Sequence, residues 1–273
     1  MVVKSLEHID FEIIIDCFLK AFENYFVKMP TDPVYYEKRW EAANVQYSQS
    51  YGMFDEEKLV GFIINAIGIR NGKIMAFNTG TGVIPAYRGK HIINSIYQYA
   101  IPKLKKIGVN TCSLEVITDN TIAIKVYERI GFKKIKKYHC YSGELALPYS
   151  VNDFELKKVD VSFLNWDKLH QEQYSWDNHI ETVKKGSYDY FVVEVSQQQV
   201  AYFIINPKNG YVAQFDVLIA GELHWKYLFS AIYSVAKSVK INNVDERLER
   251  KVRSLNQLKL ENTVDQFEMI LPI

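Results

Sequence analysis

The sequence lacks the features that mark several large classes of protein. Its 273 residues contain 33 Lys and Arg against 32 Asp and Glu, so no whole-molecule charge attracts nucleic acid or an anionic membrane. The three cysteines show no CxxC spacing, and the six histidines include no pair at ligand spacing. We therefore expect buried free thiols in a reducing compartment, no metal site and no nucleic-acid partner.

Long apolar runs are also missing. The most apolar stretch, Leu59 to Ile69, is interrupted by Asn65 and is far too short to span a bilayer. The N-terminus, MVVKSLEHIDFE, meets charge almost at once and lacks the apolar run of a signal peptide. These absences predict a cytoplasmic protein with no membrane partner. The hydrophobic share of 48% is enough to fill one large core or two modest ones.

Helical and strand patterns alternate through the first half. Apolar spacing predicts helices over 10–25 and 35–44, and three short apolar runs between 51 and 85 predict a strand meander. The elements expected next are a helix over 88–108, a strand over 111–117, a helix over 121–130 and two further strands to Leu147. This order predicts an α/β fold of the mixed α+β kind, with helices flanking a mixed sheet.

The second half repeats this order weakly. The sequence VGFIIN, Val60 to Asn65, reappears as VAYFIIN, Val200 to Asn206, and further strand and helix patterns follow each copy in the same order. The proline and small residues of 147–153 form the best candidate boundary. We therefore predict two domains, 1–148 and 149–273, of which the second is a smaller copy of the first.

A basic, glycine-containing loop follows the third strand of the meander. It reads VIPAYRGKHI, in which a proline fixes the turn and Gly89 allows close backbone approach. Backbone N–H groups at a helix start lack intrahelical partners and bind pyrophosphate well, and Arg88 and Lys90 add positive charge. Taken alone, the loop fits an ordinary helix start with solvated basic residues equally well.

A second motif, LEVITDNTIAIKVYERIGF, runs from Leu114 to Phe132. Asn120 ends a strand, Ala123 permits close packing, and Tyr127 lies one helical turn later on the same face. Together and in this order, the two motifs resemble those of the GNAT superfamily of acyl-CoA-dependent N-acetyltransferases. The resemblance is specific over residues 52–132, and the order of elements matches as far as Leu147.

The resemblance implies a sheet whose two central parallel strands splay apart, with the pantetheine arm of acetyl-CoA between them. The strand ending at Val83 would pair with this arm, and an amide at Val83 or Ile84 would stabilise the oxyanion. Asn120 and Ala123 would line the pantetheine. The pyrophosphate would be held by the amides of Tyr87, Arg88, Gly89, Lys90, His91 and Ile92.

Two residues depart from the family pattern in this loop. Ala86 stands where Gln or Arg is usual, which removes one side-chain contact to the cofactor. His91 stands where Gly or Ala is usual, and its Cβ lies where the backbone should pass close to phosphate. Both departures predict weaker binding of CoA.

The expected chemistry is direct attack of an amine on the thioester of acetyl-CoA in a ternary complex. A base must take the amine proton, and an acid must meet the departing thiolate. The spacing of Glu115 and Tyr127 is similar to that of base and acid in the family's ribosomal-protein N-terminal acetyltransferase branch, which implies these two roles. Otherwise Glu115 is an exposed carboxylate paired with a lysine, and Tyr127 is a core tyrosine.

The second half carries neither motif. VLIAGELHWKYLFS replaces the basic loop and puts Glu222 where a phosphate would lie, so this half resembles a degenerate GNAT-like domain. It would wall the substrate cleft, form a homodimer or stabilise the first domain. The acceptor, a small-molecule or peptide amine, stays open. A non-catalytic acyl-CoA sensor or assembly protein is the alternative function, and a module that binds partners through the second domain's aromatic surface is a third.

Overall fold

The N-terminal strands form a mixed sheet, as the sequence predicts. The computed structural model describes residues 1–23, 25–70 and 72–273. Antiparallel pairing joins, in this order, β1 (Val2–Ser5), β2 (Tyr51–Asp55), β3 (Lys58–Arg70) and β4 (Lys73–Val83). Next to β4 runs the parallel strand β5 (Thr111–Ile117), followed by β12 (Glu261–Pro272). The parallel pair β4–β5 therefore lies inside the sheet, covered by a strand on each side.

Helices cover both faces of this sheet. Paired residues share a face, and Phe62 and Gly82 are paired across β3 and β4. A Cβ on Gly82 would lie 2.7 Å from that of Ala21, so this face packs on α1 (Phe11–Ala21). The adjacent Gly61 points the other way, toward Ile92 of α3 (Ile92–Lys106). α1 and α3 therefore lie on opposite sides of the sheet.

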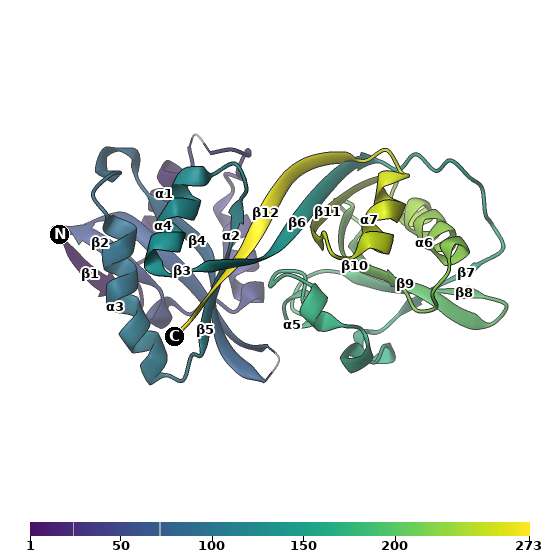
Figure 1. Ribbon diagram of the computed structural model, residues 1–273, viewed down its shortest axis with the longest axis horizontal. Coiled ribbons are helices and arrows are strands. Elements are labelled where there is room, and N and C mark those ends of the chain that lie inside the picture. Colours follow the sequence, from purple (N-terminus) through teal and green to yellow (C-terminus); the bar gives the residue numbers. More distant parts are fainter. Residues whose placement is uncertain (24, 71) are drawn as a thin grey trace. The chain divides into compact units, whose positions relative to one another are not determined.

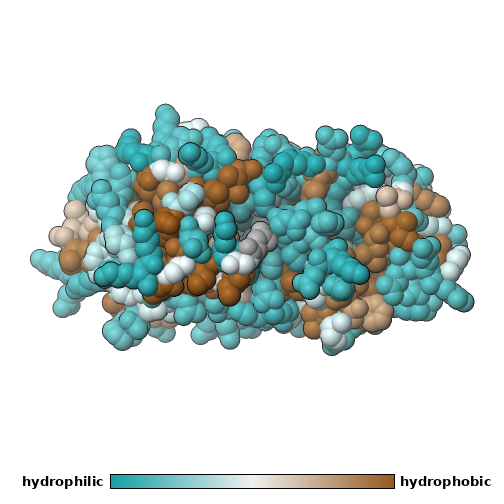
Figure 2. Space-filling model, turned by 60° about the horizontal axis from the view of Figure 1, so that its bottom comes forward, coloured by the Kyte–Doolittle hydropathy of each residue, from teal (hydrophilic) through white to brown (hydrophobic). Residues whose placement is uncertain are grey.

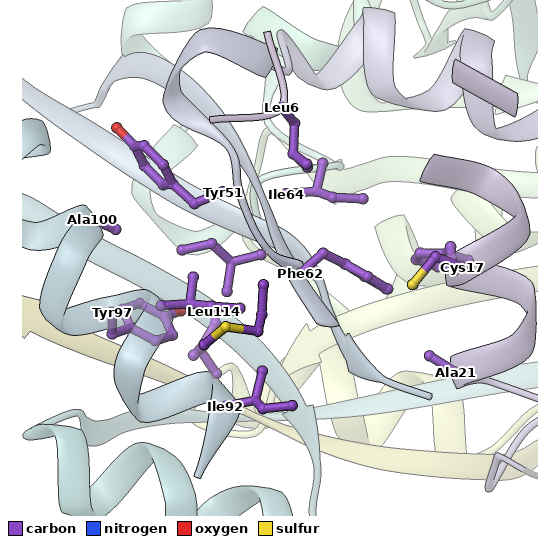
Figure 3. Packing of buried hydrophobic residues seen from close by; sticks show 14 of the residues in the cluster. Leu6, Cys17, Ala21, Tyr51, Phe62, Ile64, Ile92, Tyr97, Ala100 and Leu114 are labelled. Carbon is purple, nitrogen blue, oxygen red and sulfur yellow. The ribbon is translucent and has the colours of Figure 1, made fainter. Parts of the chain in front are cut away.

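Two further helices complete the layers. α2 (Pro33–Ala43) packs beside α1, where the Phe18 and Trp40 rings meet edge to face at 5.5 Å. α4 (Thr121–Ile130) contacts α3, and their aromatic side chains share Phe132 as a neighbour. Figure 3 shows Phe62 directed toward the helix that carries Cys17 and Ala21, with Ile92 and Tyr97 beyond the strands. One continuous hydrophobic core therefore joins both helix layers through the sheet.

Most of the predicted elements are confirmed, with differences at their ends. The first helix ends at Ala21 instead of 25, and the helix predicted over 88–108 begins at Ile92. The two strands predicted after Phe132 are one strand, β6 (Lys133–Glu144), because it pairs with one partner strand up to Glu144. The cysteines are buried and free, as predicted: Cys17, Cys112 and Cys140.

The chain forms two compact units, residues 1–135 with 267–273, and residues 136–266. This division differs from the predicted boundary at 148. The residues from Tyr138 to Glu144 pair with β11 (Ser238–Asp245), which belongs to the second unit. The last residues belong to the first unit, where the Ile273 amide donates to the Asn110 carbonyl at 3.0 Å. Strand pairing therefore overrides the composition signal at 147–153.

The second unit repeats the element order of the first (Figure 1). Its strands follow the order β6, β11, β10 (Tyr211–Val217), β9 (Gln198–Asn206), β8 (Asp189–Val195) and β7 (Glu155–Val159). α5 (Ile180–Val183) precedes β8, α6 (Glu222–Val235) follows β10, and α7 (Glu249–Asn256) follows β11. The series β9, β10, α6, β11, α7 therefore matches β3, β4, α3, β5, α4.

The surface carries scattered apolar side chains. The face drawn in Figure 2 is mainly hydrophilic, with hydrophobic residues gathered in several patches. Exposed large apolar residues include Phe26, Ile122 and Phe163, which come from distant parts of the sequence. Single exposed apolar residues are ordinary in soluble domains. Separately, none of the described helices is both long and apolar enough to cross a membrane.

Candidate active site

β4 and β5 pair over their first residues and then part. Their register runs from Met75 opposite Thr111 to Asn78 opposite Leu114, and the strands continue to Val83 and Ile117. Where parallel strands stop pairing, the facing backbone N–H and C=O groups lose their ladder partners. A gap therefore opens between the carboxyl ends of β4 and β5, which is the splay that the GNAT resemblance implies.

A buried polar cluster, made of Asn78, Thr81, Tyr97 and Tyr127, lies where the two strands part. Asn78 Nδ2 donates to Thr81 Oγ1 at 2.6 Å and to the Tyr97 hydroxyl at 2.7 Å. Tyr127 of α4 is also hydrogen-bonded to Thr81. The register between β3 and β4 shifts at Thr79, and this bulge lets Asn78 and Thr81 share one face. Side chains from β4, α3 and α4 thus meet at one point.

Burial keeps the two phenols of the polar cluster protonated. Desolvation raises the pKa of Tyr127 to about 12, although the hydrogen bond with Thr81 opposes this shift. Desolvation also raises the pKa of Tyr97 well above its ordinary value. At neutral pH Tyr127 is therefore a neutral O–H group, able to donate a hydrogen bond to an anion that forms in the gap.

Asn120 links the polar side of the gap to the segment after α1. Its Oδ1 accepts the Ala123 amide at 3.1 Å and so caps α4. Contrary to the prediction, Asn120 does not end the strand, because β5 already ends at Ile117 and a turn leads from there to Asn120. Its side chain also hydrogen-bonds to Tyr25, whose pKa burial raises. The predicted pantetheine-lining pair, Asn120 and Ala123, therefore lies at the start of α4, with Ala123 one turn before Tyr127.

Glu115 lies on β5, one residue beyond the last pair with β4, and is half-buried. Its neighbours Leu114 and Val116 are buried in the core beside α3 and α4. Because side chains alternate along a strand, Glu115 faces the opposite side, that of α1 and α2. The two predicted catalytic side chains, Glu115 and Tyr127, therefore approach the gap from opposite faces of the sheet.

At the end of β4, one edge of the strand is paired with β3, and the other edge has no neighbouring strand and faces the gap. The Ile84 amide donates to the Val60 carbonyl at 3.1 Å, so it is committed to β3 and is unsuited to the oxyanion role. Neighbouring residues of an antiparallel strand direct their N–H groups to opposite edges. The Val83 amide therefore faces the edge that β5 has left.

The predicted pyrophosphate loop lies between β4 and α3, and some of its side chains already form contacts within the protein. The Arg88 guanidinium donates from Nη2 to the Ala21 carbonyl at 3.0 Å and from Nε to the Val83 carbonyl at 3.2 Å. The Tyr87 hydroxyl donates to Asp55 Oδ2 at 2.7 Å, and the exposed Lys90 ammonium lies 4.7 Å from the Tyr87 ring centre. Both basic residues are exposed, but the Arg88 guanidinium is held by two backbone carbonyls, whereas the Lys90 ammonium lies over an aromatic ring.

Two residues just before α3 have a left-handed backbone conformation. Gly89 has φ +79°, and His91, the N-cap residue, has φ +56° with no side-chain bond to the helix. A left-handed conformation costs a residue with a Cβ about 1 kcal/mol or more. The buried Ile92 side chain packs under the sheet, so its contribution to a phosphate site is its amide. The first amides of α3 are thus left without a side-chain cap.

The corresponding gap of the second unit holds paired side chains. β10 and β11 pair through Tyr211 and Lys240, and then part as β4 and β5 do. The Lys251 ammonium of α7 lies 2.8 Å from Asp216 and is 4% exposed as a residue. The Tyr174 hydroxyl donates to the Phe215 carbonyl at 3.2 Å, so it occupies a backbone group on the edge that β10 would offer a ligand.

Comparisons with known proteins point to acetyltransferases. Residues 12–132 match the model of the acetyltransferase (GNAT) family. N-alpha-acetyltransferase 30 of Schizosaccharomyces pombe is 26% identical over 93 residues, which cover 34% of this chain and 62% of that protein. N-alpha-acetyltransferase MAK3 of Arabidopsis thaliana is 30% identical over 89 residues, covering 32% and 47%. The chain therefore matches less than two thirds of the length of these curated relatives.

One solved structure is similar over both units. A tandem GNAT protein from the clavulanic acid biosynthesis pathway matches with a TM-score of 0.70 at 12% identity, covering 99% of this chain and 98% of that one. At this identity the likeness concerns the fold. Both units of the chain therefore have the GNAT-like fold, and the family match falls within the first unit.

Proposed function

Because residues 12–132 belong to the acetyltransferase (GNAT) family, we propose that the chain is a cytoplasmic N-acetyltransferase that moves an acetyl group from acetyl-CoA to an amine. The observation that carries this proposal is the gap between β4 and β5 beside the buried Tyr127. The pantetheine arm would enter this gap and pair with the exposed edge of β4. The first amides of α3, with the Lys90 ammonium near them, would hold the pyrophosphate.

The reaction would proceed by direct attack within a ternary complex. Glu115 would accept the amine proton, directly or through water, from the α1 and α2 side. The Val83 amide would stabilise the oxyanion of the tetrahedral intermediate, because it points into the gap. The bond from carbon to sulfur then breaks, and Tyr127 would donate to the departing thiolate on the α3 and α4 side.

The acceptor we propose is the α-amino group of a peptide. Both curated relatives are N-alpha-acetyltransferases. The side of the gap that an acceptor would approach carries Glu115, and the polar contact of Arg39 with Thr79 Oγ1 at 2.7 Å lies at the bulge of β4. These polar groups would orient an amine and a peptide carbonyl.

The test is acetyl transfer to a set of peptides with free and blocked N-termini, followed by mass spectrometry. The wild-type chain should acetylate peptides with a free α-amine and leave blocked ones unchanged. Tyr127→Phe should lower kcat by about 100-fold, the usual effect of losing a general acid, with CoA affinity within about threefold. The matched control is Tyr97→Phe, which removes a hydroxyl from the same polar cluster and should change kcat much less.

Two results would contradict this proposal. If the chain binds acetyl-CoA and acetylates none of the free peptides or small amines offered, the non-catalytic acyl-CoA-binding alternative replaces it. If transfer occurs but Tyr127→Phe and Tyr97→Phe have equal effects, the acid is another group or water. Measuring the unfolding of both variants separates either result from a loss of folded protein.

A further inference from the structure

A cleft of ≈ 610 Å³ lies within the second unit. Its walls come from the end of β10, the start of α6, the connection from β11 to α7, and the segment around Leu169. The volume falls in the range of small-molecule pockets, which is about 300–1,000 Å³. Neither the sequence motifs nor the proposed acetyl transfer gives this cleft a role.

The floor of the cleft holds a buried ammonium group. Lys251 lies 2.8 Å from Asp216 Oδ2, and its nitrogen lies 4.9 Å and 5.1 Å from the ring centres of Phe215 and Tyr174. A lysine ammonium has three N–H donors, and within the described chain Asp216 is its acidic partner. The remaining N–H donors therefore have aromatic faces around them and can donate to an oxygen of a ligand in the cleft.

The rim carries more positive than negative charge. Lys168 and Arg250 are exposed, and neither forms an ion pair within the part of the chain that the structure describes. Arg247 also lines the cleft, and its guanidinium is held by the buried Asp245. The acids that line the cleft are the exposed Glu249 and Asp216, which is paired with Lys251, so the lining cations outnumber the lining acids.

The remaining wall is apolar and aromatic. Trp225 is 8% exposed and packs at 6.4 Å from the Phe215 ring, while still lining the cleft. Leu169, Leu218 and Tyr202 complete this wall. Trp225 therefore packs in the core and also offers a surface on which a ligand can lie.

We propose that this cleft binds a small organic anion, a carboxylate or a phosphate monoester with an apolar body. The anionic group would lie among Lys168, Arg250 and Lys251, and the apolar body would lie on Trp225 and Leu218. A second acetyl-CoA is not the ligand, because Lys251 and Tyr174 occupy the gap that its pantetheine arm would need. The proposal is independent of acetyl transfer in the first unit.

The test is titration of the full chain with phenyl phosphate and with benzoate, using benzamide as the neutral analogue. CoA is kept at saturation so that any phosphate site in the first unit is filled. We expect one equivalent of anion to bind and benzamide to bind at least tenfold more weakly, because charge-assisted hydrogen bonds are lost. The double variant Lys168→Glu with Arg250→Glu should weaken anion binding by at least tenfold.

The matched control is Lys208→Glu with Lys237→Glu, which makes the same change in net charge at exposed positions of the same unit outside the cleft. It should leave binding within about twofold, since screened charges at a distance contribute little. Binding of one anion class supports the proposal and names the class. Equal binding of benzamide, an unaffected rim variant, or no binding at all would overturn it.

Discussion

Arg88 and Lys90 are neighbours in one loop, yet their side chains have different tasks. The Arg88 guanidinium donates to the carbonyl of Ala21, the last residue of α1, and to the carbonyl that ends β4. Carbonyls at a helix end lack intrahelical partners, so a cation there also complements the helix dipole. Lys90 is exposed, with its ammonium over the Tyr87 ring. The first residue stabilises the fold, and the second is available to a ligand.

We predict that Arg88→Ala lowers the free energy of unfolding by about 1–2 kcal/mol, because two hydrogen bonds from a charged donor are lost. Lys90→Ala should change it by less than about 0.5 kcal/mol, as exposed substitutions usually do. Urea denaturation measures both. CoA titration at low and high salt should show the reverse order, with Lys90→Ala losing more affinity and more salt dependence. Equal unfolding energies in the two variants would refute this division of roles.

The site could be predicted from the sequence where a motif fixes the backbone, and could not where side chains meet across the fold. Tyr127 and Asn120 follow from their spacing on one helix. Asn78, Thr81 and Tyr97 were missed, because their contacts join residues 16 and 19 positions apart through a bulge. The signal available was Asn78 itself, a polar residue inside a buried apolar strand, which requires partners. The direction of the Arg88 side chain depends on its hydrogen bond to the end of α1, which no pattern in the local sequence reveals.

At the scale of one element, β4 has different faces toward its two helix layers. Gly80 and Gly82 face α1, where the Cβ of Ala21 and the Phe18 ring leave no room for larger side chains. Asn78 and Thr81 face the opposite layer and carry the polar cluster. The alternation of glycine with threonine therefore lets α1 lie close while keeping the other face polar.

We predict that Gly82→Ala destabilises the chain by about 1–3 kcal/mol, because the added Cβ would lie 2.7 Å from both Ala21 Cβ and the Phe62 ring. Gly80→Ala in the same strand is the control. Its Cβ would meet one flexible ring edge at 3.0 Å, so we expect a cost below about 1 kcal/mol. Thermal and urea unfolding rank the two. A larger loss for Gly80→Ala would mean that α1 can shift away from Gly82.

Element ends were harder to predict than element types. The strand over 111–117 and the helix over 121–130 have the predicted bounds, because Asn120 and Gly131 mark the helix ends locally. β6 was split in two in the prediction, since its run of lysines hides a strand that pairs with β11 about 100 positions later. Long-range pairing also explains why the unit boundary differs from 148.

At the scale of the whole molecule, two units with one element order differ in what lies between their parted strands. In the first unit the gap borders a hydrogen-bonded polar cluster and an amide that faces no strand. In the second, Lys251 with Asp216 and Tyr174 with Phe215 occupy the same position. Burying an ammonium and a carboxylate costs desolvation energy, which is offset here by their pairing and by two aromatic rings. Opening this gap for a ligand would separate the Lys251 ammonium from the Asp216 carboxylate and so lose the pairing that offsets the desolvation energy.

We therefore predict that calorimetric titration with acetyl-CoA gives one equivalent per chain. Lys90→Glu in the first unit should weaken that binding about tenfold or more, because it places a negative charge beside the proposed pyrophosphate site. Arg250→Glu in the second unit makes the same change in net charge and should leave both stoichiometry and affinity unaltered. Two equivalents in the wild type would mean that Lys251 and Tyr174 leave the second gap on binding. A single equivalent that is lost with Arg250→Glu instead of Lys90→Glu would move the CoA site to the second unit, and the proposed catalytic roles of Glu115 and Tyr127 would fall with it.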